Sequence, residues 1–105
     1  MPGTEMERKM VSREDFLFTI GYDGESAVVD GKARAAHGRS GTMDLARKGL
    51  YRAAYSSALK SGKAAEMEEF IGYFSGLTGG AYRTSADLAR LFGVEEHPVK
   101  RVLAL

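Results

Sequence analysis

The sequence predicts an α+β domain in which an N-terminal β-hairpin, or a three-stranded antiparallel meander, packs on three to four helices. Three patterns support this prediction. Aromatic and β-branched residues alternate with other residues over 16–22, which is strand spacing. Asp-Gly pairs stand at 23–24 and at 30–31, where hairpin turns are expected. The rest of the chain carries apolar residues at helical spacing.

The predicted hairpin joins a strand at 16–22 to a strand at 25–29. Asp23 and Gly24 are expected to form its two-residue turn, because a type I′ turn needs positive φ at both central residues. Residues 32–36 then fit a third strand and a short helix equally well. Residues 1–11 mix charges without periodicity, so we expect a flexible tail there and one compact domain over 12–105.

Two helices are predicted in the middle of the chain. The turn sequence HGRSGT places Thr42 where it can cap a helix over 43–59. Gly49 lies inside that helix and costs about 1 kcal/mol of helix propensity. A more clearly amphipathic helix is expected over 64–75, with Phe70 among the residues of its apolar stripe.

The C-terminal segment predicts two further helices separated by a glycine. Thr84 begins a capping-box pattern, so a helix is expected to start there. Gly93 ends this helix, and a second one is expected from about 96 to 103.

This segment resembles the helix-turn-helix of DNA-binding regulators. The residues that carry the resemblance are Ala89, Gly93 and Val99, with Leu88, Phe92, Val94 and Val102 at the supporting apolar positions. A small residue lets two helices cross closely, and glycine adopts the left-handed turn between them. The resemblance implies that the first residues of the second helix enter the major groove. These positions hold Glu95, Glu96 and His97, which is a departure from the basic residues that suit a phosphate-rich groove.

The basic residues are unevenly distributed, although the net charge is only +1. Segment 32–63 has eight basic residues against the single acid Asp44, a net charge of +7, which suits a polyanion. Tyr55 lies near several of these cations, and such aromatic residues can stack on bases. The candidate nucleic-acid or polyanion site comprises Arg39, Arg47, Lys48, Arg52, Tyr55, Lys60 and Lys63, with Lys100 and Arg101 as additional phosphate contacts.

The leading functional interpretation is a small non-enzymatic nucleic-acid-binding or regulatory protein. One alternative is a protein–protein interaction module, in which the helix-turn-helix shape is structural and the basic segment docks on an acidic protein or on a second copy in a homodimer. In the simplest alternative, the basic segment neutralises the acidic flanks of the same fold.

Several other classes of function are disfavoured by composition. The chain has no cysteine, which excludes disulfides and thiolate metal sites. His37 and His97 do not stand in a metal-ligand spacing, so no cofactor is expected and an enzyme is a minority alternative. HGRSGT before a helix could hold a phosphate, but it lacks the spacing of a P-loop and is more simply a connector. No apolar run approaches 18 residues, so we expect a cytoplasmic protein without a membrane partner.

Overall fold

The computed structural model describes residues 8–105, and the chain divides into two compact units. Unit 1 combines the N-terminal part up to Gly38 with Glu96–Leu105, whereas unit 2 is the continuous segment Arg39–Glu95. Over the described residues there are six helices and three strands, which confirms the predicted mixture of helix and sheet. The extent of a single domain over 12–105 stays a prediction.

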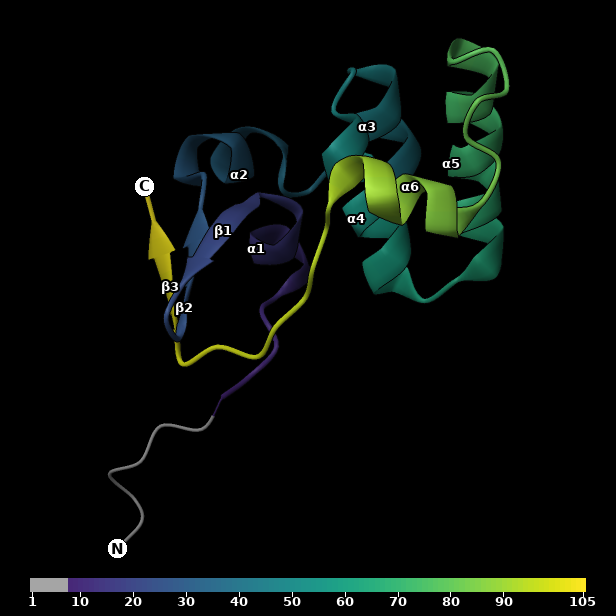
Figure 1. Ribbon diagram of the computed structural model, residues 1–105. Coiled ribbons are helices and arrows are strands. Elements are labelled where there is room, and N and C mark those ends of the chain that lie inside the picture. Colours follow the sequence, from purple (N-terminus) through teal and green to yellow (C-terminus); the bar gives the residue numbers. More distant parts are fainter. Residues whose placement is uncertain (1–7) are drawn as a thin grey trace, which may run out of the picture. The chain divides into compact units, whose positions relative to one another are not determined.

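Unit 1 contains a three-stranded sheet with the order β1-β2-β3. β1 (Thr19–Asp23) pairs antiparallel with β2 (Ser26–Val29), and β2 pairs parallel with β3 (Arg101–Ala104). Figure 1 shows β3 on the side of β2 that faces away from β1. The sheet is therefore mixed, and the antiparallel meander is wrong, because the third strand comes from the distant C-terminal segment.

The N-terminal strand begins later than predicted. Arg13–Leu17 form the short helix α1, whose N-cap Ser12 accepts a hydrogen bond from the Asp15 N–H at 3.3 Å. Phe16 and Leu17, expected in a strand, are each only 2% exposed within this helix. The alternating segment 16–22 therefore contains the end of α1 and the start of β1. In its first residues, burial of the aromatic and aliphatic side chains outweighs their preference for β structure.

The hairpin turn is shifted by one residue from its predicted position. Asp23 pairs with Ser26, so the two central residues are Gly24 and Glu25 rather than Asp23 and Gly24. Of these two central residues, Gly24 alone has a positive φ, which is 60°. Positive φ at the first central residue alone is the requirement of a type II′ turn, which also matches the twist of a hairpin.

The ambiguous segment 32–36 is helical. It belongs to α2 (Gly31–His37), and the Asp30 carboxylate accepts the Ala33 N–H at 3.0 Å as its N-cap. The second Asp-Gly pair therefore starts a helix instead of closing a hairpin. Gly31 also lies close to the end of the chain: its N–H donates to the Leu105 carbonyl at 3.2 Å, and a Cβ there would lie 2.7 Å from that oxygen.

Residues before position 12 contribute to unit 1. Residues 1–7 of the predicted tail lie outside the described residues. Lys9 and Val99 exchange two backbone hydrogen bonds of 2.8 Å each, and Val11 is buried. The end of the predicted tail is therefore part of the fold.

Unit 2 is helical and consists of α3 (Thr42–Arg47), α4 (Tyr51–Ser61), α5 (Ala64–Leu77) and α6 (Ser85–Phe92). Figure 1 shows α6 crossing over α4 toward α5. Its core is aromatic: the ring centroid of Tyr55 lies 6.5 Å from that of Phe70 and 5.5 Å from that of Phe92. The predicted helix over 64–75 is confirmed as α5.

The single helix predicted over 43–59 is wrong, because it is divided at Gly49. This glycine has a φ of 81°, and its N–H donates to the Ala46 carbonyl at 3.0 Å while the Leu50 N–H donates to Leu45 at 2.9 Å. These two bonds form a Schellman motif, which ends α3. Thr42 is also not the cap, since Gly41 holds that position. The Thr42 hydroxyl is instead buried and hydrogen-bonded to other side chains, Ser57 at 2.8 Å and Glu66.

The C-terminal segment contains the first predicted helix and lacks the second. Thr84 and Asp87 form a capping box at the start of α6, and Gly93 ends it with a φ of 59°. The helix expected over 96–103 is wrong: no helix follows Gly93, and Arg101–Ala104 form β3. Pro98 opposes helical backbone in the residue before it, and the apolar residues beyond it pair with β2. Ala89, expected at a helix crossing, is exposed.

Candidate nucleic-acid interface

The predicted binding residues are divided between the two units. Arg39, Arg47, Lys48, Arg52, Tyr55, Lys60 and Lys63 belong to unit 2, whereas Lys100 and Arg101 belong to unit 1. None of α1–α6, the helices of the described residues, is long and apolar enough to cross a membrane.

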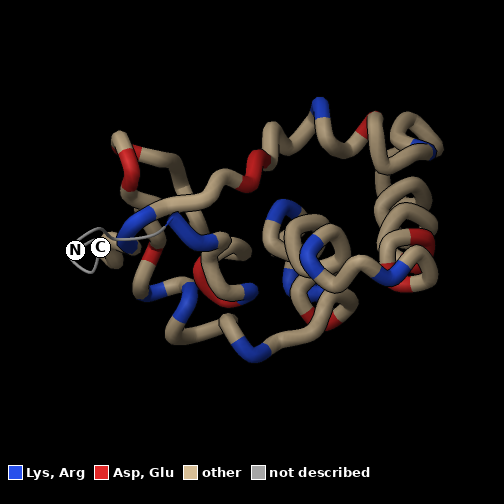
Figure 2. The backbone as a smooth tube through the Cα atoms, turned by 90° about the horizontal axis from the view of Figure 1, so that it is seen from below, with Lys and Arg blue, Asp and Glu red and all other residues tan. Residues whose placement is uncertain are grey.

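Three of the cations in unit 2 surround α3. Arg39 precedes the helix, Arg47 is its last residue and Lys48 is its C-cap, and all three are exposed. At 1.5 Å per residue α3 is about 9 Å long, so the three charges belong to a short stretch of structure. We call Arg39, Arg47 and Lys48 the α3 basic cluster. Figure 2 marks the Lys and Arg positions in blue and the Asp and Glu positions in red. Asp44 is the acid on α3, whereas three glutamates lie on α5.

The end of α3 controls where Lys48 lies. The Schellman motif at Gly49 stops the helix directly after Lys48. The Lys48 ammonium donates a hydrogen bond to the Ser40 hydroxyl at 3.1 Å, so its side chain runs back along α3 toward the residue next to Arg39. The turn and this hydrogen bond together hold the Lys48 ammonium beside Ser40, which precedes α3 and is the chain neighbour of Arg39.

The charges of the α3 basic cluster are not neutralised locally. Among residues 8–105, none of its three members forms an ion pair. Segment 39–48 contains one acid, Asp44, which leaves a net charge of +2. Exposed cations without a fixed counter-charge attract phosphates over about 8–10 Å at physiological salt.

Arg52 occupies a different setting from the cluster. It lies in the first turn of α4, and its Nε donates to the Phe92 carbonyl at the end of α6, at 3.3 Å. A cation at this place also complements the negative end of the α6 dipole. Lys48 and Arg52, both expected within one helix over 43–59, are separated, because Lys48 is the C-cap of α3 and Arg52 lies on α4.

Lys60 lies in the last turn of α4, and Lys63 follows it beside acidic residues of α5. Lys60 is half-buried, and Lys63 is the exposed N-cap of α5. Lys63 lines a cavity of about 400 Å³ together with Glu66 and Glu69. This mixture of charges is less suited to a polyanion than the α3 basic cluster is.

Tyr55 is not available to stack on a base. Its side chain is 2% exposed and packs against Phe70 and Phe92 in the core of unit 2. Its hydroxyl donates to the Ser85 carbonyl at 3.5 Å. The prediction of a nucleic-acid contact for this residue is therefore wrong, because an aromatic ring on the inner side of α4 fills the space against α5 and α6.

Lys100 and Arg101 are engaged in unit 1. The Lys100 ammonium lies 3.0 Å from Glu25 Oε2, and Arg8 Nε donates to Glu25 Oε1 at 2.7 Å. These hydrogen bonds, first from Lys100 and then from Arg8, hold the pKa of Glu25 below its ordinary value. Arg101 donates to the Ser26 hydroxyl at 3.5 Å. Both predicted residues lie at the start of a strand, rather than on a helix that could enter a groove.

No metal site accompanies these residues. Within the part of the chain that the structure describes, no three His, Cys, Asp or Glu side chains could hold a metal ion. His97 contacts the ring of Tyr22, with 4.8 Å between centroids and an edge-on angle of 84°. Comparison of the chain with protein-family models, curated proteins and solved structures finds no match.

Sequence reasoning missed a second group of cations, Arg8 and Lys9. Both fall in the segment predicted as a tail, and both lie next to the C-terminal strand through Glu25 and Val99. In the sequence around them, only the apolar Val11 indicates that this segment belongs to the fold. The pairing of Lys9 with Val99 joins residues 90 positions apart, so no local pattern predicts it.

Proposed function

We propose that this chain is a non-enzymatic nucleic-acid-binding protein, in which unit 2 contacts phosphates through the α3 basic cluster. The observation that carries the proposal is three exposed cations, without an ion pair among residues 8–105, around a helix about 9 Å long. Lys and Arg side chains are among the groups that contact phosphate oxygens in protein–nucleic acid complexes, and they also supply the charge that neutralises phosphates.

The binding that we propose is independent of base sequence. Tyr55 is buried, and no helix is present over 96–103 to enter a major groove. Phosphate contacts determine position and affinity but carry no direct sequence information. We therefore expect similar affinity for strands of different sequence and a strong dependence on salt.

The test is a titration of a fluorescein-labelled 20-nucleotide DNA, single-stranded or duplex, measured by anisotropy at several salt concentrations. Three phosphate contacts predict a slope of log K against log salt of about −3 on a duplex. Lys48→Glu is expected to weaken binding and to reduce the magnitude of this slope by about 1. Absence of binding at low salt, or a slope near zero, would contradict the proposal.

Lys32→Glu is the matched control. Lys32 is also exposed and forms no ion pair within 8–105, but it lies on α2 of unit 1. The two variants change charge equally, so general electrostatic attraction alone predicts equal losses. A loss confined to Lys48→Glu supports the α3 basic cluster, whereas equal losses count against it.

A further inference from the structure

Within residues 8–105, the edge strand of unit 1 is unpaired along most of its length on one side. β3 is the last strand of the sheet, and Lys9 pairs with this segment at Val99 alone. Over the described residues, no strand pairs with Arg101–Ala104 on the side away from β2. Such an edge presents unpaired backbone N–H and C=O groups, which is the arrangement that accepts an added strand.

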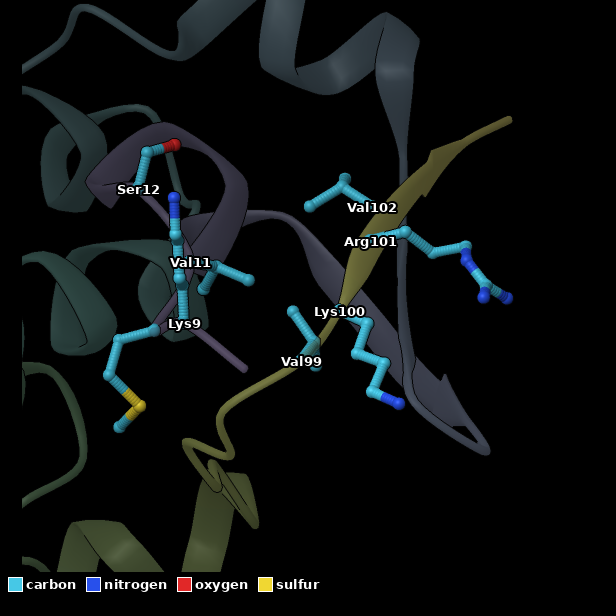
Figure 3. A pocket seen from close by; sticks show the side chains of 8 residues that line it. Lys9, Val11, Ser12, Val99, Lys100, Arg101 and Val102 are labelled. Atoms are coloured by element: carbon cyan, nitrogen blue, oxygen red, sulfur yellow. The ribbon is translucent and has the colours of Figure 1, made fainter. Parts of the chain in front are cut away.

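An apolar cavity of about 360 Å³ accompanies this edge. It lies between the segments 9–12 and 99–102. Figure 3 shows the side chains of Val11, Val99 and Val102 turned toward the space between these segments. A strand added beside β3 could place an aliphatic side chain among these three valines, where it would leave water.

The residues around the cavity carry positive charge. Lys9, Lys100 and Arg101 line it, and no acidic residue does. Figure 3 shows the Lys100 and Arg101 side chains leaving the chain on the side opposite to the valines. The neighbouring acid, Glu25, is shared by Arg8 and Lys100. These four cations and one carboxylate sum to +3.

We propose that β3 binds an extended peptide in which acidic residues alternate with aliphatic ones, as a fourth strand of the sheet. Successive side chains of a strand point to opposite faces. One set of the peptide's side chains would therefore enter the valine-lined cavity, and the other would lie beside Arg101 as opposite-charge cross-strand pairs. This inference concerns unit 1 and does not depend on the proposed binding of nucleic acid by unit 2.

Charge separates this peptide from a second copy of the chain as the occupant. Two β3 edges paired about a two-fold axis would bring together two groups of charge +3 each. Like charges across adjacent strands are destabilising, whereas a peptide with glutamates on one face neutralises the group. A second copy is consequently an outcome that the experiment must detect.

The test uses the full chain and a defined probe, the fluorescein-labelled peptide Ser-Glu-Val-Glu-Val-Glu-Ser with blocked ends, measured by anisotropy. We expect saturable binding, and a loss of about five- to tenfold for Arg101→Glu, because an attractive cross-strand pair becomes repulsive. Lys32→Glu on α2 is expected to bind like the wild type. The same peptide with lysine in place of glutamate is expected not to bind.

Backbone pairing has its own control. Two further peptides carry N-methyl groups on one or the other alternate set of amides. Methylation of the set that faces β3 is expected to abolish binding, while the other set is tolerated, because only alternate N–H groups of a strand point to one neighbour. Equal binding of the two methylated peptides would overturn strand addition.

Two other results would overturn the proposal. The first is a wild-type affinity of an Arg101→Glu variant that circular dichroism shows to be folded. If that variant fails to fold, Lys9→Glu takes its place, since Lys9 lines the same cavity and its backbone pairs with Val99 just before β3. The second is a concentration-dependent dimer, seen by light scattering, that excludes the peptide. It would identify a second copy as the occupant of the edge.

Discussion

The two units use their basic residues in different ways. In unit 1 several cations pair with acids: Arg34 lies 2.5 Å from Asp15, and Glu25 is shared by two partners. In unit 2 the α3 basic cluster has no such partners among residues 8–105. The basic block at 32–63 is therefore divided between two structural settings. Its first two cations belong to unit 1, and Arg34 there stabilises structure, whereas the cations around α3 remain available to a ligand.

Unit 1 is built from two separate segments of the chain, whereas unit 2 is one continuous segment. Among the changes that test this difference, we expect a C-terminal truncation to have the largest effect. A chain of residues 1–95 lacks β3 and Val99 but contains all of unit 2. Because β2 then loses one of its two neighbouring strands, we expect backbone amides of unit 1 to lose hydrogen-exchange protection and those of unit 2 to keep it. Hydrogen exchange followed by mass spectrometry checks this. Equal loss in both units would remove the distinction between them.

Tyr55→Ala tests the aromatic core of unit 2. Removing a buried ring is expected to cost about 3–5 kcal/mol of unfolding free energy, measured by urea denaturation. Tyr55→Phe removes only a long hydrogen bond and is expected to cost less than about 1 kcal/mol. The Phe variant should also bind nucleic acid as the wild type does. A selective loss of binding in that variant would return Tyr55 to the interface.

Gly49→Ala tests the turn that separates α3 from α4. Alanine in the left-handed region is expected to destabilise the protein by about 1–2 kcal/mol. Gly72→Ala is the matched control, because Gly72 is exposed within α5 and a Cβ there meets open space. That change should stabilise by about 0.5–1 kcal/mol. Thermal denaturation of both variants measures the difference, and effects of the same sign would contradict the assigned turn.

Glu25→Gln is expected to give the smallest effect, confined to a range of pH. The folded-state pKa of Glu25 lies below its ordinary value of 4.5, so its ionised form stabilises unit 1 above that pH. This contribution is lost as the pH falls through the folded-state pKa. Urea denaturation of wild type and variant should therefore differ at neutral pH, begin to approach each other near pH 4.5, and converge only below the folded-state pKa of Glu25. A difference that persists at low pH would point to packing rather than charge.

Local rules account for the parts of the fold that the sequence predicts correctly. The capping box at Thr84, the left-handed Gly93 and the amphipathic α5 each depend on residues a few positions apart. Pairing between β2 and β3 depends on residues about 75 positions apart, which no local pattern encodes. For the same reason, Val102 fits a helix-turn-helix register and a strand equally, and its pairing with Ala27 decides between them.

The candidate site was predictable to a similar extent. The sequence identifies which residues are cationic, and Lys and Arg are rarely buried, so the exposure of Arg39, Arg47 and Lys48 is expected. Whether a cation has an acidic partner depends on tertiary contacts, as with Lys100 and Glu25. The burial of Tyr55 has the same origin, since its neighbours Phe70 and Phe92 come from other helices.

The parallel pairing of β2 with β3 also determines an order of events during synthesis. The last residue of β2 is Val29 and the first of β3 is Arg101, so the ribosome adds about 70 residues between them. At about 5–20 residues per second, this takes roughly 4–14 s. Every residue of unit 2 has been translated before the first residue of β3. During this interval the second edge of β2 has no native partner, so the nascent hairpin is exposed to chaperones and to misassembly before the sheet can close.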